Sequence, residues 1–192
     1  MNAKHVLKLL APYLAVGVFW LLWPNAWFAI LAYHAQILFW MKDSRPEIKT
    51  GEFRKTFFIA LPTVLAGPAL YLLLPHITNA DLSGWLEAHH LSRLSFALMI
   101  PYFGVVHPFL EQLHWSRLRD ASPVSHIMFA GYHAIVLYSL LDISWLALSF
   151  VVLVATSFSW RWMERKSGGL AVPIASHILA DLGVVVAAWL SM

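Results

Sequence analysis

The chain contains no cysteine and has few charged side chains. Without cysteine it can form no disulfide, no thiolate metal site and no cysteine nucleophile. Charged residues make up 12% of its 192 residues, where a soluble domain carries roughly a quarter. Hydrophobic residues make up 60%, and the mean hydropathy is +0.67. So few charges cannot cover a water-exposed surface, which predicts an integral membrane protein surrounded by lipid.

The composition also bears on partners. The net charge is +3, but no cluster of lysine and arginine is interleaved with aromatic residues as a nucleic-acid groove requires. The ten tryptophans fit a protein with two membrane interfaces, where indole rings settle. We therefore expect membrane lipids as partners and no nucleic acid.

Apolar stretches near the length needed to cross a bilayer, about 20 residues, recur along the whole chain. We expect seven transmembrane helices near 6–23, 25–41, 57–74, 94–113, 124–141, 143–160 and 170–190. In the first, an apolar run follows Lys4 and Lys8 as in a signal peptide, but no small-residue cleavage site comes after it, so we expect the segment to be retained. Pro62 and Pro68 are expected to kink the third helix. With no repeat or soluble appendage visible, residues 1–192 are predicted to form one all-α, polytopic transmembrane bundle.

The cations predict the orientation of these helices. With the N-terminus in the cytoplasm, the expected outer segments hold only Arg93. The inner segments then hold Lys4, Lys8, Lys42, Arg45, Lys49, Arg54, Lys55, Arg117, Arg119, Arg161, Arg165 and Lys166. This bias follows the positive-inside rule and predicts a multi-pass protein of the cell (plasma) membrane with a cytoplasmic N-terminus.

Five ionisable residues lie inside the predicted helices, where each costs about 2.5–3.5 kcal/mol on insertion scales. They are His107, Glu111, His133, His177 and Asp181. His107 and Glu111 are four residues apart, as are His177 and Asp181, so each pair shares a helix face. Their convergence from three helices predicts one shared polar site.

A local interpretation of each residue remains open. His34 and His107 could each be a packed histidine that is hydrogen-bonded to a backbone carbonyl. Asp181 could be a structural partner of His177. His114 and His126 lie near the inner boundary, where they would be interfacial.

The shared site would suit two kinds of hydrolysis. A carboxylate beside an imidazole can deprotonate water, and a second imidazole can stabilise the oxyanion that forms at a peptide carbonyl. Alternatively, Glu111, His133, His177 and Asp181 form an acceptable zinc set, in which the metal activates the water. The HExxH pattern of soluble metalloproteases is absent.

Two short patterns carry a family resemblance. Phe129-Ala-Gly-Tyr-His133 matches Phe-x-x-x-His, and His177-Ile-Leu-Ala-Asp181 matches His-x-x-x-Asn/Asp. In this order they resemble the CAAX-protease and bacteriocin-processing family of glutamic-type intramembrane proteases. A third signature of that family, Glu-Glu-x-x-x-Arg, is degraded here: Glu111 takes the first position, Gln112 the second and Ser116 that of the arginine. Since the two support positions are both neutral, no charge is expected to be left without a partner, and Arg117 comes one residue too late.

The resemblance implies a CAAX prenyl endopeptidase-like core in the last four helices and cleavage of a membrane-associated protein or peptide. Glu111 and His133 would activate the water, and His177, oriented by Asp181, would stabilise the oxyanion. Further substrate-binding contacts would come from Gln112, Phe129 and His107. No cofactor is implied, with zinc as the alternative.

Three other hypotheses remain. A catalytically inactive relative would serve as a membrane immunity or maturation partner. Histidine and carboxylate chains also serve transporters and proton relays, which often show repeats. A haem or metal carrier would use His34, His107 and His133.

Overall fold

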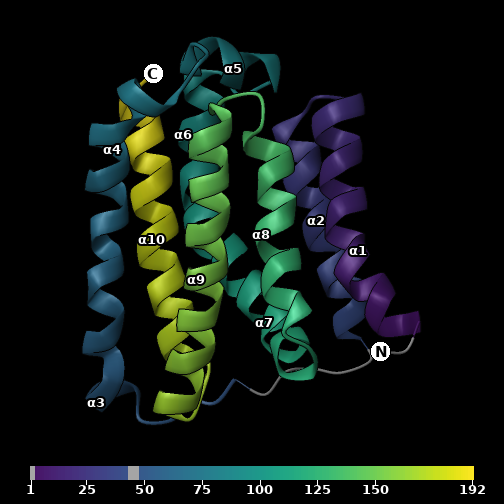
Figure 1. The fold of residues 1–192 in the computed structure, drawn as a ribbon, viewed down its shortest axis with the longest axis vertical. Helices are drawn as coiled ribbons and strands as arrows, with labels where there is room; N and C mark the ends of the chain where they lie inside the picture. Colours follow the sequence, from purple (N-terminus) through teal and green to yellow (C-terminus); the bar gives the residue numbers. More distant parts are fainter. Residues whose placement is uncertain (1–2, 43–47) are drawn as a thin grey trace.

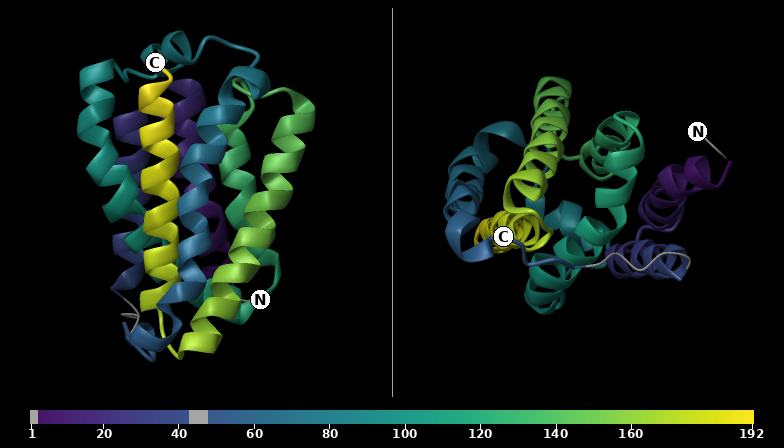
Figure 2. Two further views of the ribbon diagram at one scale, coloured as in Figure 1. Left: turned by 90° about the vertical axis from the view of Figure 1, so that its left-hand side faces the viewer. Right: turned by 90° about the horizontal axis from the view of Figure 1, so that it is seen from below.

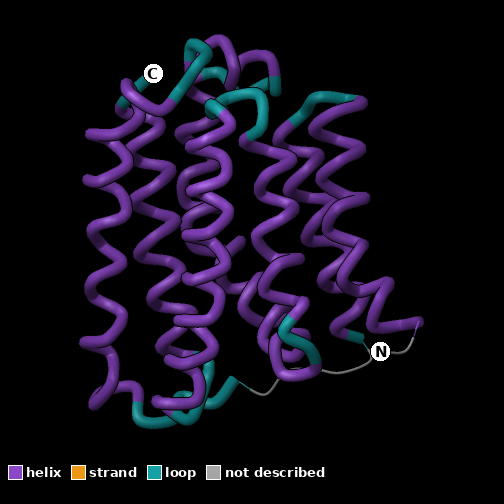
Figure 3. The backbone as a smooth tube through the Cα atoms, in the orientation of Figure 1, coloured by secondary structure: helices purple, strands orange, loops and turns teal. Residues whose placement is uncertain are grey.

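The computed structural model describes residues 3–42 and 48–192, and within them the chain is helical, without a β-strand (Figure 3). The N-terminal helices are α1 (Ala3–Gly17) with the π-helical η1 (Val18–Leu22), and α2 (Ala26–Met41). Next come α3 (Phe53–Thr56), the 3-10 segment η2 (Phe57–Leu65), α4 (Ala66–Ile77) and α5 (Leu82–Ala88). The rest are α6 (Arg93–Pro101), the π-helical η3 (Tyr102–Val106), α7 (His107–Ala121), α8 (Val124–Leu137), α9 (Ile143–Ser167) and α10 (Ala171–Leu190).

Five helical stretches are long and apolar enough to cross a membrane. They are Ala3–Leu22, Phe53–Ile77, Arg93–Ala121, Ile143–Ser167 and Ala171–Leu190. The two other predicted helices correspond to α2 and α8, which are apolar but shorter. The expected helix over 124–141 ends at Leu137, and α5 lies in the segment that was expected to be a loop. The prediction of an all-α fold is therefore confirmed, and five of its stretches have the length and composition of membrane-spanning helices.

The helices stand side by side, with α1 and α2 at one flank of the bundle and the α3–η2–α4 rod at the other (Figures 1 and 2). Helix α10 packs closely on η2 and α4, and Gly67 and Gly183 allow this approach. A Cβ added to Gly67 would lie 2.6 Å from the Cα of Gly183. Small residues at such crossings let membrane helices come within van der Waals contact.

Local sequence explains the breaks and irregular turns. The side chain of Asn25 accepts a hydrogen bond from the Phe28 backbone N–H (3.0 Å) and caps α2. Gly168 adopts a left-handed conformation (φ 70°) and ends α9. Pro62, expected to kink its helix, lies in the 3-10 segment η2, because proline has no N–H for an α-helical bond.

Charge separates between the two ends of the bundle. One end carries α3 with Arg54 and Lys55, and the last turns of α9 with Arg165 and Lys166; the other carries α5 and Arg93 at the start of α6 (Figure 1). Arg45, counted with the cationic end in the prediction, lies outside the described residues. We call the end with α3 and the last turns of α9 the cationic end, and the opposite end the α5 end.

Candidate active site

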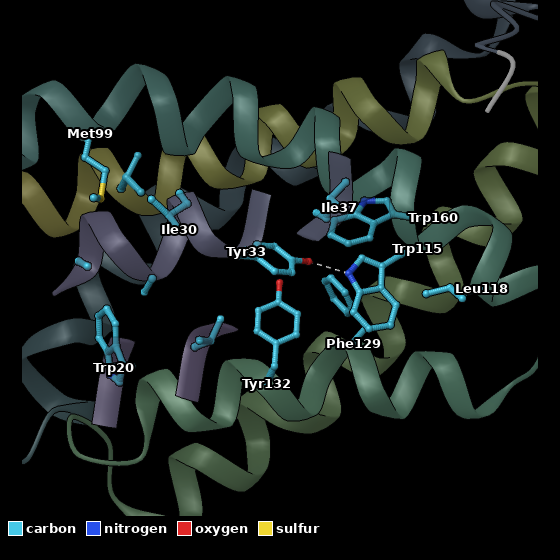
Figure 4. Packing of buried hydrophobic residues seen from close by; sticks show 14 of the residues in the cluster. Trp20, Ile30, Tyr33, Ile37, Met99, Trp115, Leu118, Phe129, Tyr132 and Trp160 are labelled. Carbon is cyan, nitrogen blue, oxygen red and sulfur yellow. Dashed lines mark hydrogen bonds between the residues drawn. The ribbon is translucent and has the colours of Figure 1, made fainter. Parts of the chain in front are cut away.

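Glu111 lies on α7 and is 1% exposed. Its Oε1 accepts hydrogen bonds from the hydroxyls of Tyr33 on α2 and Tyr132 on α8. Figure 4 shows the Tyr132 hydroxyl pointing toward Tyr33, whose own hydroxyl faces Trp115 and accepts a hydrogen bond from the indole N–H (2.8 Å). The tyrosines therefore hold Oε1 and fix the orientation of the carboxylate.

The second oxygen of Glu111 faces two imidazoles. Oε2 lies 3.5 Å from Nε2 of His107 and 3.6 Å from Nε2 of His177. It is buried and has no hydrogen-bond partner among the described residues. The chemically available atom of this carboxylate is therefore Oε2, between two nitrogens that can donate to it.

His177 is held on three sides. The Gln112 amide nitrogen lies 3.1 Å from Nδ1, Asp181 Oδ2 lies 3.4 Å from Nε2, and the Trp160 ring stacks on the imidazole at 3.9 Å. An amide nitrogen can only donate, so Nδ1 accepts and the proton of the neutral ring is on Nε2. The Nε2–H thus points to the side of Glu111 and Asp181.

Arg119 fixes the orientation of the Gln112 amide. Its Nη2 donates to Gln112 Oε1, which leaves the amide nitrogen to face His177. Arg119 is 4% exposed, and its Nε and Nη1 have no partner among the described residues. Gln112 and Ser116 are neutral as expected, but the sequence interpretation did not foresee that Arg119 would bind Gln112. The sequence signal was the seven-residue spacing, which places Arg119 two turns beyond Gln112 on the same face.

His133 reaches Glu111 only indirectly. Its Nε2 lies 3.2 Å from the hydroxyl of Tyr132, which in turn donates to Glu111. Its Nδ1 lies 2.8 Å from the backbone carbonyl of Phe129 four residues earlier, which must accept, so Nδ1 is protonated. The intervening Tyr132, like Tyr33, was missed by the sequence interpretation. Phe129 itself is fully buried, packed against Trp115 and Trp160.

His107 lies against Glu111, as the four-residue spacing predicted, and it also contacts a second histidine. Its Nδ1 is 3.0 Å from Nε2 of His34, whose Nδ1 is 2.7 Å from the hydroxyl of Tyr102. His34 is therefore not the isolated, carbonyl-bonded residue of the local interpretation. His126 lies apart from this network, with Nδ1 2.8 Å from Ser157 Oγ.

The described residues contain no group of three or more histidine, aspartate or glutamate side chains placed to hold a metal ion. Of the four proposed zinc ligands, Glu111, His177 and Asp181 come together, and His133 is one tyrosine hydroxyl away from Glu111.

Comparison with known proteins gave no relative: no family model matches the chain, and no curated protein or solved structure matches it significantly.

Proposed function

We propose that this protein is an intramembrane endopeptidase of the CAAX-protease and bacteriocin-processing type, in which Glu111 activates the attacking water. The observation that carries the proposal is the position of Glu111 Oε2, buried, unpartnered among the described residues and flanked by two imidazole nitrogens. A carboxylate in this setting is a general base with donors already in place beside it.

The reaction then runs through Glu111 and His177, with neighbouring side chains in support. Glu111 Oε2 takes a proton from the water while the water oxygen bonds to the peptide carbonyl carbon. The Nε2–H of His177, oriented by Asp181 and Gln112, donates to the developing oxyanion. The C–N bond then breaks, and the proton on Glu111 passes to the leaving nitrogen. When protonated on both nitrogens, His133 donates its Nε2–H to the Tyr132 oxygen, whose own proton is donated to Glu111, and so supports the carboxylate.

The substrate we infer is a membrane-associated protein or peptide, because the carboxylate lies between helices that cross lipid. Asp181, whose side chain is 17% exposed, and the partly exposed His133 mark the edge of the site nearest the surface. The protein would cross the cell membrane seven times, α2 and α8 included, with the N-terminus and the cationic end in the cytoplasm.

The test compares membranes from cells that carry the wild type, Glu111→Gln or His177→Ala, and identifies new peptide termini by mass spectrometry. We expect termini that appear only with the wild type, since loss of a general base costs about a hundredfold or more. His126→Gln removes a buried histidine outside the site and serves as the control. If both site variants insert normally and still process a substrate as fast as the wild type, the protein is not this kind of protease.

Two alternatives have support of their own. The near-complete burial of Glu111, with Gln112 where the family has a second acid, favours an inactive relative that acts as an immunity or maturation partner. It predicts unchanged termini but a partner that copurifies. The zinc-dependent alternative requires His133 to move past Tyr132 toward Glu111, and it predicts cleavage that a chelator abolishes and zinc restores.

A further inference from the structure

A chain of side chains that the proposed hydrolysis does not use runs from Glu111 toward the α5 end. It passes from Glu111 to His107, then to His34 and to Tyr102, with 3.5, 3.0 and 2.7 Å between successive atoms. Tyr102 begins η3, nine residues before Glu111, which places it about 14 Å further toward the α5 end. The chain thus leaves the site in the direction away from the cationic end.

A π-helical turn brings the two ends of this chain onto one histidine. The His107 N–H donates to the carbonyl of Tyr102, five residues earlier. In a regular α-helix, residues five apart differ by about 140° around the axis. The wider π turn reduces this offset, so that His107 and Tyr102 both reach His34 on α2. Such turns are uncommon and occur often at functional sites.

We propose that Tyr102, His34 and His107 form a proton relay that serves Glu111 from the α5 end of the membrane. The inference rests on the proposed role of Glu111 as the base. It adds a proton path on the side of the protein opposite to the cationic end.

The hydrogen-bond polarity of the chain has two states, one for each protonation state of Glu111. With Glu111 ionised, Tyr102 O–H donates to His34 Nδ1, His34 Nε2–H donates to His107 Nδ1, and His107 Nε2–H points to Oε2. Each imidazole is neutral, with one donating and one accepting nitrogen.

One concerted shift converts this state into the other. The His107 Nε2 proton moves to Glu111, the His34 Nε2 proton to His107 Nδ1, and the Tyr102 proton to His34 Nδ1, while Tyr102 takes a proton from a hydronium ion, which becomes water. One proton enters at Tyr102 and one appears on Glu111. No imidazolium needs to form, which matters because an extra charge is costly in this medium.

Several other polar groups surround Glu111. Tyr33 and Tyr132 donate to Oε1, and His177 with Asp181 lies on the other side of Oε2. Beyond these, His133 ends at the Phe129 carbonyl, and Trp115 binds Tyr33. Tyr102, which is partly exposed like Asp181 and His133, lies at the end of its chain.

The test follows the protonation of Glu111 directly. The full-length protein is placed in phosphatidylcholine vesicles, and the infrared carboxyl band that Glu111→Gln removes is recorded after a pH jump. We expect Tyr102→Phe and His34→Gln to slow protonation about a hundredfold or more, because a positioned proton-transfer group contributes that much. Tyr13→Phe and His126→Gln, which remove a hydroxyl bonded to the Met128 carbonyl and a histidine bonded to Ser157, should leave the rate unchanged.

Wild-type rates in Tyr102→Phe would overturn the relay, and this variant removes a single oxygen atom, so it tests the relay even if His34→Gln does not fold. The two proposals fail separately. If Tyr102→Phe slows protonation of Glu111 but the wild type cleaves no peptide, the relay is supported and the protease proposal is rejected. If the wild type cleaves peptides but Tyr102→Phe leaves the protonation rate unchanged, only the relay is rejected.

Discussion

Gln112 joins Arg119 to His177, because its oxygen accepts from the guanidinium while its nitrogen donates to the imidazole 3.1 Å away. A single buried amide therefore transmits the position of a cation on α7 to the tautomer of a histidine on α10. This relationship explains why a glutamine is compatible with the site: a carboxylate at position 112 would pair with Arg119 but could not donate to Nδ1.

Substitutions of Gln112 should affect the free energy of unfolding and the rate of peptide cleavage differently. Gln112→Ala leaves the Arg119 guanidinium without its acceptor and should lower the free energy of unfolding by about 1–3 kcal/mol. Gln112→Glu should unfold at or above the wild-type denaturant midpoint, because a carboxylate satisfies Arg119 better. It should nevertheless reduce cleavage, because His177 loses the donor that fixes its tautomer. Full activity of Gln112→Glu would show that the amide does not set this tautomer.

The tyrosines on Glu111 Oε1 should matter more than an ordinary buried hydroxyl. Tyr33→Phe and Tyr132→Phe each remove a donor to a buried carboxylate and should destabilise the protein by about 1.5–3 kcal/mol. Tyr13→Phe removes a donor to the neutral Met128 carbonyl and should cost about 0.5–1.5 kcal/mol. Unfolding in detergent measures all three. Equal losses would indicate that Glu111 is protonated in the resting protein, since a neutral carboxyl is an ordinary acceptor.

The contact between α4 and α10 should tolerate no added methyl group. Gly67→Ala would place a Cβ 2.6 Å from Gly183, so the two helices must move apart, and overpacking of this kind costs about 1–3 kcal/mol. Gly17→Ala is the matched control, because its Cβ meets nothing within 4 Å. It should be neutral or stabilising by up to about 1 kcal/mol, as alanine is the better helix former. Thermal unfolding of both variants and the wild type in the same detergent measures these two changes in stability.

The absence of cysteine makes the orientation directly testable. Lys166→Cys at the end of α9 and Glu87→Cys on α5 are both exposed positions at opposite ends of the bundle. In intact cells, a membrane-impermeant maleimide should label the cysteine at position 87 and leave that at position 166 unlabelled until the membrane is opened. The reverse pattern would place the cationic end outside, against the positive-inside rule.

The sequence predicted the parts of this structure that depend on neighbouring residues. Hydropathy located the helices, and four-residue spacing placed His107 beside Glu111 and His177 beside Asp181, because a regular helix brings such residues onto one face. Predictions were weakest where the backbone departs from that geometry. The π turn at η3 changes which residues share a face, and the four-residue spacing did not anticipate it.

The sequence by itself determined that the chain is a helical membrane protein and that Glu111, His177 and Asp181 are costly residues needing partners inside lipid. Only the tertiary structure decided which residues those partners are. Tyr33 and Tyr132 bind one oxygen of Glu111, His107 stands beside the other, and His133 is one residue removed. The Tyr33 and Tyr132 hydrogen bonds to Glu111 join residues 78 and 21 positions apart on different helices. Hydropathy and helical spacing record only which face of a helix is polar, whereas the packing of one helix against another selects the atoms that meet.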